Sequence, residues 1–182
     1  MIGEEACHPA TRAMLAYGRA LTRRAEPPRI AGADGVADRL FVFEGRFHPE
    51  VKERTAAMVR AFGEGLVSLF GRDLRHTDML SLFGAPDRVL MQGLITAASS
   101  ANDPALARGA ALTGSGLVVG VEIMVMPLRS DMAGPGRHLG HIQPLGGEAF
   151  TRGEKLERIV LHALYPPAPR AGSALRLVVS ND

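Results

Sequence analysis

Apolar residues recur at helical spacing near the start of the chain. Within residues 6–24 they are separated by four, three and four positions, and arginines occupy the rest of the helical wheel, which predicts an amphipathic helix. Two consecutive prolines at positions 27 and 28 end this helix. Its apolar positions are Ala10, Met14, Tyr17 and Leu21.

Extended segments are predicted where β-branched and aromatic residues gather between turn residues. A Gly-Ser-Gly sequence at 114–116 separates two of these segments, and "RSDMAGPG" separates the last two. The first two are expected to pair antiparallel across a long turn. The five expected strands are residues 39–44, 54–63, 105–113, 117–128 and 137–145.

Three helical segments are expected between the second and third strands. The first covers residues 64–70 and ends at Gly71, and the second is capped by Thr77 or Asp78. The third and longest begins at Pro86 and ends in the "SSANDP" cluster.

The strand over residues 117–128 is apolar on both of its faces, so both faces need cover. The three helical segments can bury one face. The N-terminal helix or a second subunit is left to bury the other. The odd positions are Leu117, Val119, Val121, Ile123 and Val125, and the even positions include Val118, Met124, Met126 and Leu128.

The sequence therefore predicts an α+β fold with a five-stranded antiparallel sheet, helices on one face and an N-terminal amphipathic helix. The expected division is a helix at 1–28, a domain at 29–146 and a partly flexible extension at 147–182. In that extension "LERIVLHAL" and "ALRLVV" are separated by "YPPAPRAGS". It is expected to add little core, so truncation after Gly147 should leave cooperative unfolding intact.

Composition excludes several classes of protein. The 182 residues carry a formal net charge of +2, with arginines and acidic residues interleaved, so a nucleic-acid site is not expected. No apolar run is long enough to span a membrane, and no signal peptide is visible. A cytoplasmic protein is expected. Cys7 is the only cysteine, which excludes an internal disulfide.

The stretch from residue 10 to residue 145 resembles the MopJ-like group of single-domain bacterial PAS proteins. The matching segments are "YGRALTRRAEPPR", the signature "VRAFGEGLVSLFGRDLRHTDMLSLF" and "VEIMVMPL". Members usually carry tryptophan in the leading helix and at the end of the signature, where this chain has Gly18 and Phe83. The resemblance implies a PAS-like fold and a non-enzymatic signalling or interaction module.

Cofactors that PAS domains often hold are not expected here. In haem-binding members the ligand usually comes from the helix before the last three strands, and residues 87–99 contain no histidine. Flavin photochemistry needs a cysteine within the segment "GRDLRHTDML", whereas Cys7 lies in the N-terminal helix. No cofactor and no metal are therefore expected.

Four polar residues remain as candidates for chemistry. His138 and His141 have HxxH spacing, but residues three apart on a strand point to opposite faces, which disfavours a shared metal. His76 lies beside Asp78, where a capping turn with a solvated histidine is the simpler interpretation. Glu122 interrupts the most apolar strand and is expected to face solvent or pair with an arginine, with a buried contact as the alternative.

The leading hypothesis is a cytoplasmic regulatory module that acts through association with an unidentified regulatory protein and as a homodimer, with gating by a small apolar ligand left open. The alternative is a cofactor-binding sensor or small enzyme that uses His76, His138 or His141. The expected ligand-lining residues are Phe41, Phe43, Leu94, Ile123 and Val125. The expected interface residues are Met14, Tyr17, Leu21, Met124 and Met126.

Overall fold

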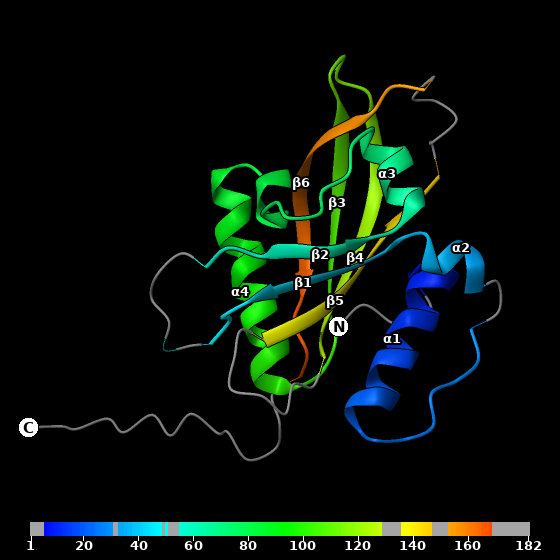
Figure 1. Cartoon of the computed structure of the whole chain (residues 1–182), viewed down its shortest axis with the longest axis vertical. Coiled ribbons are helices and arrows are strands. Elements are labelled where there is room, and N and C mark those ends of the chain that lie inside the picture. Colours follow the sequence, from blue (N-terminus) through cyan, green and yellow to red (C-terminus); the bar gives the residue numbers. More distant parts are fainter. Residues whose placement is uncertain are drawn as a thin grey trace, which may run out of the picture.

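A single six-stranded antiparallel sheet forms the centre of the computed structural model, which describes residues 6–30, 33–48, 50, 55–128, 136–146 and 153–168 (Figure 1). The strand order is β2-β1-β5-β4-β3-β6, so the first two strands join the last strands through β5. The strands are β1 (Leu40–Gly45), β2 (Met58–Phe62), β3 (Ala105–Thr113), β4 (Val118–Leu128), β5 (Gly136–Pro144) and β6 (Leu156–Tyr165).

Three helices cover the inner face of the sheet: α3 (Glu64–Phe70), the 3₁₀ helix η2 (Met79–Leu82) and α4 (Ala85–Ala101). Gly71 ends α3 with a φ of 65°, a left-handed conformation that glycine adopts without strain. The Asp78 side chain caps η2 by accepting the backbone N–H of Leu80. Their buried side chains and the inner face of the sheet form one apolar core.

The outer face carries α1 (Pro9–Thr22), which packs on β4 and β5, and the short α2 (Ala33–Ala37) lies close to it (Figure 1). His8 caps α1 with its side chain, and Pro9 follows at the first helical position, where a missing N–H costs nothing. A second apolar cluster lies between α1 and the sheet. From Val121 to Met126 both faces of β4 are thus covered, whereas Val118 at the start of the strand stays exposed.

Most of the expected elements are confirmed. Strand β3 has the predicted bounds, β4 begins one residue later than predicted, and β1 and β5 are shifted by one residue at both ends. Strand β2 is shorter than predicted, because residues 55–57 follow an irregular path fixed by Asp78, which accepts the N–H of Ala57 at 2.9 Å. Helix α2 was not anticipated by the periodicity, since five residues are too few to show one.

The expectation of five strands is wrong, because β6 forms within the segment expected to be an extension. It pairs with β3 along its whole length, and its side chains Leu156 and Ile159 are 2% and 0% exposed. Its other edge forms a parallel bridge from Ile159 to Phe83, and Asp87 accepts the N–H of Leu161 at 3.2 Å. The piece "ALRLVV" lies outside the described residues.

Across the described ranges, the helices are all too short or too polar to cross a bilayer.

Removal of β6 should abolish cooperative folding, in contrast to the expectation drawn from the sequence. Truncation after Gly147 uncovers β3 and the inner core, so soluble folded protein should be lost. As a milder test, Ile159→Ala should lower the free energy of unfolding by about 2–4 kcal/mol, and the matched control Arg158→Ala, on an exposed residue, by less than about 0.5 kcal/mol. Urea unfolding of the two variants measures this. Equal effects would show that β6 packs only weakly.

Candidate functional site

A partly buried ion pair lies on the outer face of the sheet. Glu122 of β4 is fully buried, and Arg108 stands opposite it on β3. The Arg108 guanidinium donates to Glu122 Oε1 from Nη2 at 2.6 Å and from Nε at 3.0 Å. The sequence predicts that Glu122 faces solvent or pairs with an arginine, with a buried contact as the alternative. In the structure Glu122 is paired with Arg108 and is also buried.

The same pair holds the N-terminus of α1. Glu122 Oε2 accepts the backbone N–H of His8 at 3.0 Å, and Arg108 Nη2 also donates to the carbonyl oxygen of Ala6. The His8 side chain accepts the N–H of Ala10, which begins the helix. Arg108, Glu122 and His8 are called the N-terminal anchor below. It fixes the position at which α1 meets the sheet.

Two buried polar side chains lie in the layer between α1 and the sheet. His141 of β5 is fully buried, and neither ring nitrogen has a partner within the described part of the chain; the same holds for the Thr11 hydroxyl. Burial lowers the pKa of His141 to about 4, and the nearby positive charge of Arg39 adds to this effect. His141 is therefore neutral at physiological pH.

The expected interface residues meet within one chain. Met14, Met124 and Met126 are buried in the outer cluster, and Tyr17 and Leu21 pack against it half-buried. Helix and strand approach closely at Gly18, where an added Cβ would lie 2.7 Å from the Met126 sulfur. The N-terminal helix of the same chain thus supplies the cover that β4 needs here.

Helix α1 covers only part of the outer face. Cross-strand partners share a face, so beyond Arg108 and Glu122 the sheet presents a further group of small and apolar residues. Val118 is 62% exposed and Leu145 is 44% exposed. This group is called the distal outer face and consists of Ala110, Leu112, Val118, Gly120, Leu145 and Val160.

The residues expected to line a ligand cavity lie together in the inner core. Phe41 and Phe43 stack with ring centroids 5.6 Å apart, and α4 contributes Leu94 from above the sheet. Ile123 and Val125 complete the set from β4, and all five side chains are at most 3% exposed. They pack on one another and on neighbouring core side chains.

The three candidate histidines lie in three separate places. His138 points into the inner core, where its ring stacks on Phe43 and its Nε2 lies 2.8 Å from the Ser99 hydroxyl. His141 lies on the outer face, as the strand period predicted for an HxxH pair. His76 is exposed in a turn with a φ of 64°. Among the described residues no three His, Cys, Asp or Glu side chains are grouped to hold a metal.

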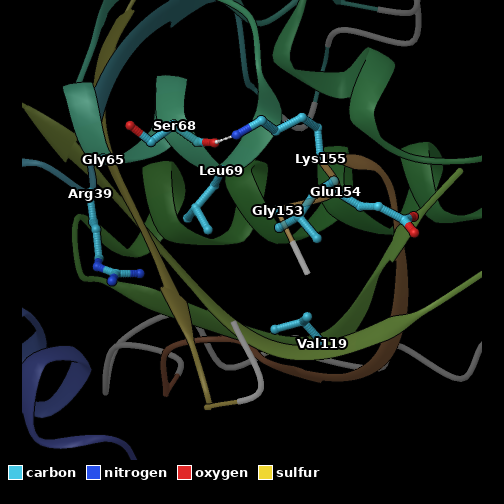
Figure 2. Close-up of a pocket in the computed structure, with 9 residues that line it drawn as sticks. Arg39, Gly65, Ser68, Leu69, Val119, Gly153, Glu154 and Lys155 are labelled. Atoms are coloured by element: carbon cyan, nitrogen blue, oxygen red, sulfur yellow. Dashed lines mark hydrogen bonds between the residues drawn. The ribbon is translucent and has the colours of Figure 1, made fainter. Parts of the chain in front are cut away.

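An open cleft of about 280 Å³ lies between α3, the start of β4 and the residues that lead into β6 (Figure 2). Leu69 and Val119 face each other across it, and Lys155 Nζ reaches the carbonyl oxygen of Ser68 at 3.0 Å. The lining residues are Arg39, Gly65, Ser68, Leu69, Val119, Gly153, Glu154, Lys155 and Leu156.

The cleft could not be predicted from the sequence, because part of its lining comes from the segment expected to be an extension. These lining residues are Gly153, Glu154, Lys155 and Leu156. The alternation of apolar and polar residues in "LERIVLHAL" was the available signal for β6. Nothing in the sequence brings that segment next to Arg39 and Leu69, which are distant along the chain. The N-terminal anchor was within reach, because a three-residue turn at 114–116 places residue 108 opposite residue 122.

One family model and several solved structures are similar to this chain. A family model described as "PAS domain" matches residues 6–143. No curated protein matches the chain. Among solved structures, the PAS domain of a protein from Colwellia psychrerythraea is 12% identical, with 63% of this chain and 93% of that chain covered and a TM-score of 0.45.

Two LOV proteins give similar values. A fungal LOV domain photoreceptor is 16% identical, with 70% of this chain and 90% of that chain covered and a TM-score of 0.44. A LOV protein from Rhodobacter sphaeroides is 11% identical, with 67% and 72% covered and a TM-score of 0.42.

Loss of Arg108 should destabilise the protein strongly, because it leaves the buried Glu122 carboxylate without its charge partner. Arg108→Met should cost about 3 kcal/mol, and the double variant Arg108→Met with Glu122→Leu should recover most of that loss. Arg137→Met is the matched control, since Arg137 pairs with Glu44 at the surface and its side chain is 64% exposed, so less than about 1 kcal/mol is expected. Urea unfolding measures these changes in the free energy of unfolding. Equal losses in Arg108→Met and Arg137→Met would contradict the role assigned to the N-terminal anchor.

Stability should fall as pH decreases from about 6.5 to about 4. Burial lowers the folded-state pKa of His138 and of His141 to about 4, whereas an unfolded histidine titrates near 6.5. Between these values the unfolded chain binds more protons, so each histidine removes roughly 2–3 kcal/mol by the acid end of the window and nothing above its alkaline end. His141→Leu should reduce this pH dependence by about half, and His162→Gln, on an exposed residue, should leave it unchanged. Urea unfolding across this range measures it; an unchanged slope in His141→Leu would contradict the assignment.

Proposed function

The chain belongs to the PAS domain family, and we propose that it is a non-enzymatic sensory module that acts through protein–protein association. PAS domains are typically sensory and non-catalytic, and the described residues place no nucleophile, base and orienting acid together. The inner core is packed with side chains, and the candidate histidines are dispersed. Signal transfer by a changing contact surface fits such a domain better than turnover does.

The distal outer face is the observation that carries this proposal. Helix α1 buries its part of the sheet, and the anchor marks the limit of that cover. Beyond it, Val118 and Leu145 stay exposed on a sheet face whose centre is made of the small residues Ala110 and Gly120. Exposed apolar side chains grouped on one sheet face are typical of an interaction surface.

A second copy of the chain is the partner that this surface fits best. Small central residues let a facing sheet approach closely, and an identical surface supplies matching apolar side chains on both sides of a two-fold axis. The homodimer expected from the sequence would then be held by the distal outer face next to α1, while Met14, Tyr17 and Leu21 stay on their own sheet. A regulatory protein partner would compete for, or bind beside, the same surface.

Three further parts of the proposal rest on the resemblance to the MopJ-like group of PAS proteins. They comprise membership of the MopJ-like bacterial group, a cytoplasmic location and gating by a small ligand. The rival hypothesis is a cofactor sensor or small enzyme that uses His76, His138 or His141. These residues lie in a turn, in the inner core and on the outer face, and none of them is grouped with two other metal-ligating side chains among the described residues.

Charge on the distal outer face should dissociate the dimer without unfolding it. Val118→Glu with Leu145→Glu should give a monomer by light scattering at a concentration where the wild type is a dimer, with an unchanged melting temperature because both side chains are exposed. Val89→Glu is the matched control, since Val89 is 72% exposed on α4 and lies away from the sheet face. A wild-type monomer at high micromolar concentration, or equal dissociation by the control, would refute this surface.

A further inference from the structure

We propose that the cleft between α3 and the start of β6 binds a small monoanion that carries an apolar tail. It is a different place from the inner core, where the sequence suggested a ligand. None of Phe41, Phe43, Leu94, Ile123 and Val125 lines it. At about 280 Å³ it is at the lower end of ligand pockets, so the occupant must be small.

The floor of the cleft is apolar and preformed. Val119 and Leu156 are each 2% exposed, and both belong to the inner core, which fixes their positions. Leu69 packs against the same core from α3 and faces Val119 across the hollow (Figure 2). A hydrocarbon tail placed between these side chains would leave water without displacing core residues.

The rim supplies positive charge from two separate parts of the chain. Arg39 immediately precedes β1, and Lys155 immediately precedes β6. Lys155 Nζ lies 3.0 Å from the Ser68 carbonyl, which uses one of the three ammonium donors and holds the side chain across the cleft. A carboxylate can therefore accept a charge-assisted hydrogen bond there.

Glu154 is the acidic residue among the described residues of the lining, and it limits the charge of the occupant. Glu154 accepts the Ser115 hydroxyl at 2.6 Å, and its carboxylate points away from Lys155 (Figure 2). Of the described lining residues, Arg39 and Lys155 are cationic and Glu154 is acidic, a balance that favours one negative charge over a polyanion. A small carboxylic acid with an apolar tail would contact the apolar floor with its tail and the cationic rim with its carboxylate.

This inference deepens the sensory role proposed above, because the cleft joins α3 to the entrance of β6. A ligand that contacts Lys155 and Leu69 together would stabilise β6 in the sheet. Binding and association are measured separately, so the failure of one does not decide the other.

The test uses octanoate with the full chain, followed by amide chemical shifts in two-dimensional NMR and by calorimetry. Octanoate should shift residues of α3 and residues 153–156, whereas octanamide, which has the tail without the charge, and acetate, which has the charge without the tail, should bind at least about tenfold more weakly. Shifts confined to other parts of the domain, or equal affinity for octanamide, would overturn the proposal.

Variants locate the charge. Lys155→Gln should weaken octanoate binding about tenfold or more and leave the fold intact, because Lys155 is exposed. Arg158→Gln removes an exposed charge three residues further along, outside the lining, and should have no effect. Arg39→Gln is the second variant, with an unchanged melting temperature as its folding control. Retention of full affinity in both Lys155→Gln and Arg39→Gln would refute the site.

Discussion

A strand that is apolar on both faces dictates how this domain is built. β4 carries Val119, Val121, Ile123 and Val125 on one face and Met124 and Met126 on the other, and all six are at most 2% exposed. A sheet with such a strand at its centre is insoluble unless a layer lies on each side. The helices between β2 and β3 form one layer, and α1, which lies outside the sheet region of the sequence, must return to form the other.

The ion pair between Arg108 and Glu122 fixes the point on the sheet at which the layer formed by α1 ends. A buried ion pair costs desolvation, so the contact of Arg108 with Glu122 contributes less to stability than apolar packing of equal volume would. What it provides is position: Glu122 accepts the His8 amide, and methionine side chains, which adapt to many neighbours, could not set the register of α1 alone. The buried His141 imposes a similar demand, since it tolerates this layer only when neutral.

Local patterns were sufficient for most of the fold and insufficient for the site. Strands β3 and β4 could be predicted almost residue by residue, because Gly114 and Gly116 mark the turn and the apolar residues between turns are continuous. β6 could not be predicted for a physical reason. Leu156 and Ile159 are buried by Phe83 and by β3, and a short amphipathic segment before prolines does not indicate partners so distant in sequence. The cleft depends on that same strand. It could not be found while Lys155 was assigned to an extension.

The sixth strand also connects the two surfaces to which function is assigned here. β6 begins at the cleft, where Lys155 contacts α3, and runs beside β3, whose outward residues Ala110 and Leu112 belong to the distal outer face. Bulges interrupt the pairing of β6 with β3 at two places, next to Arg108 and next to Leu112. Each bulge places one extra residue of β6 opposite β3 and bends β6 locally, whereas the ladder between β3 and β4 is regular. Because Leu156 and Ile159 of the same strand are buried in the inner core, any shift of β6 along β3 would disturb that core as well as the distal outer face.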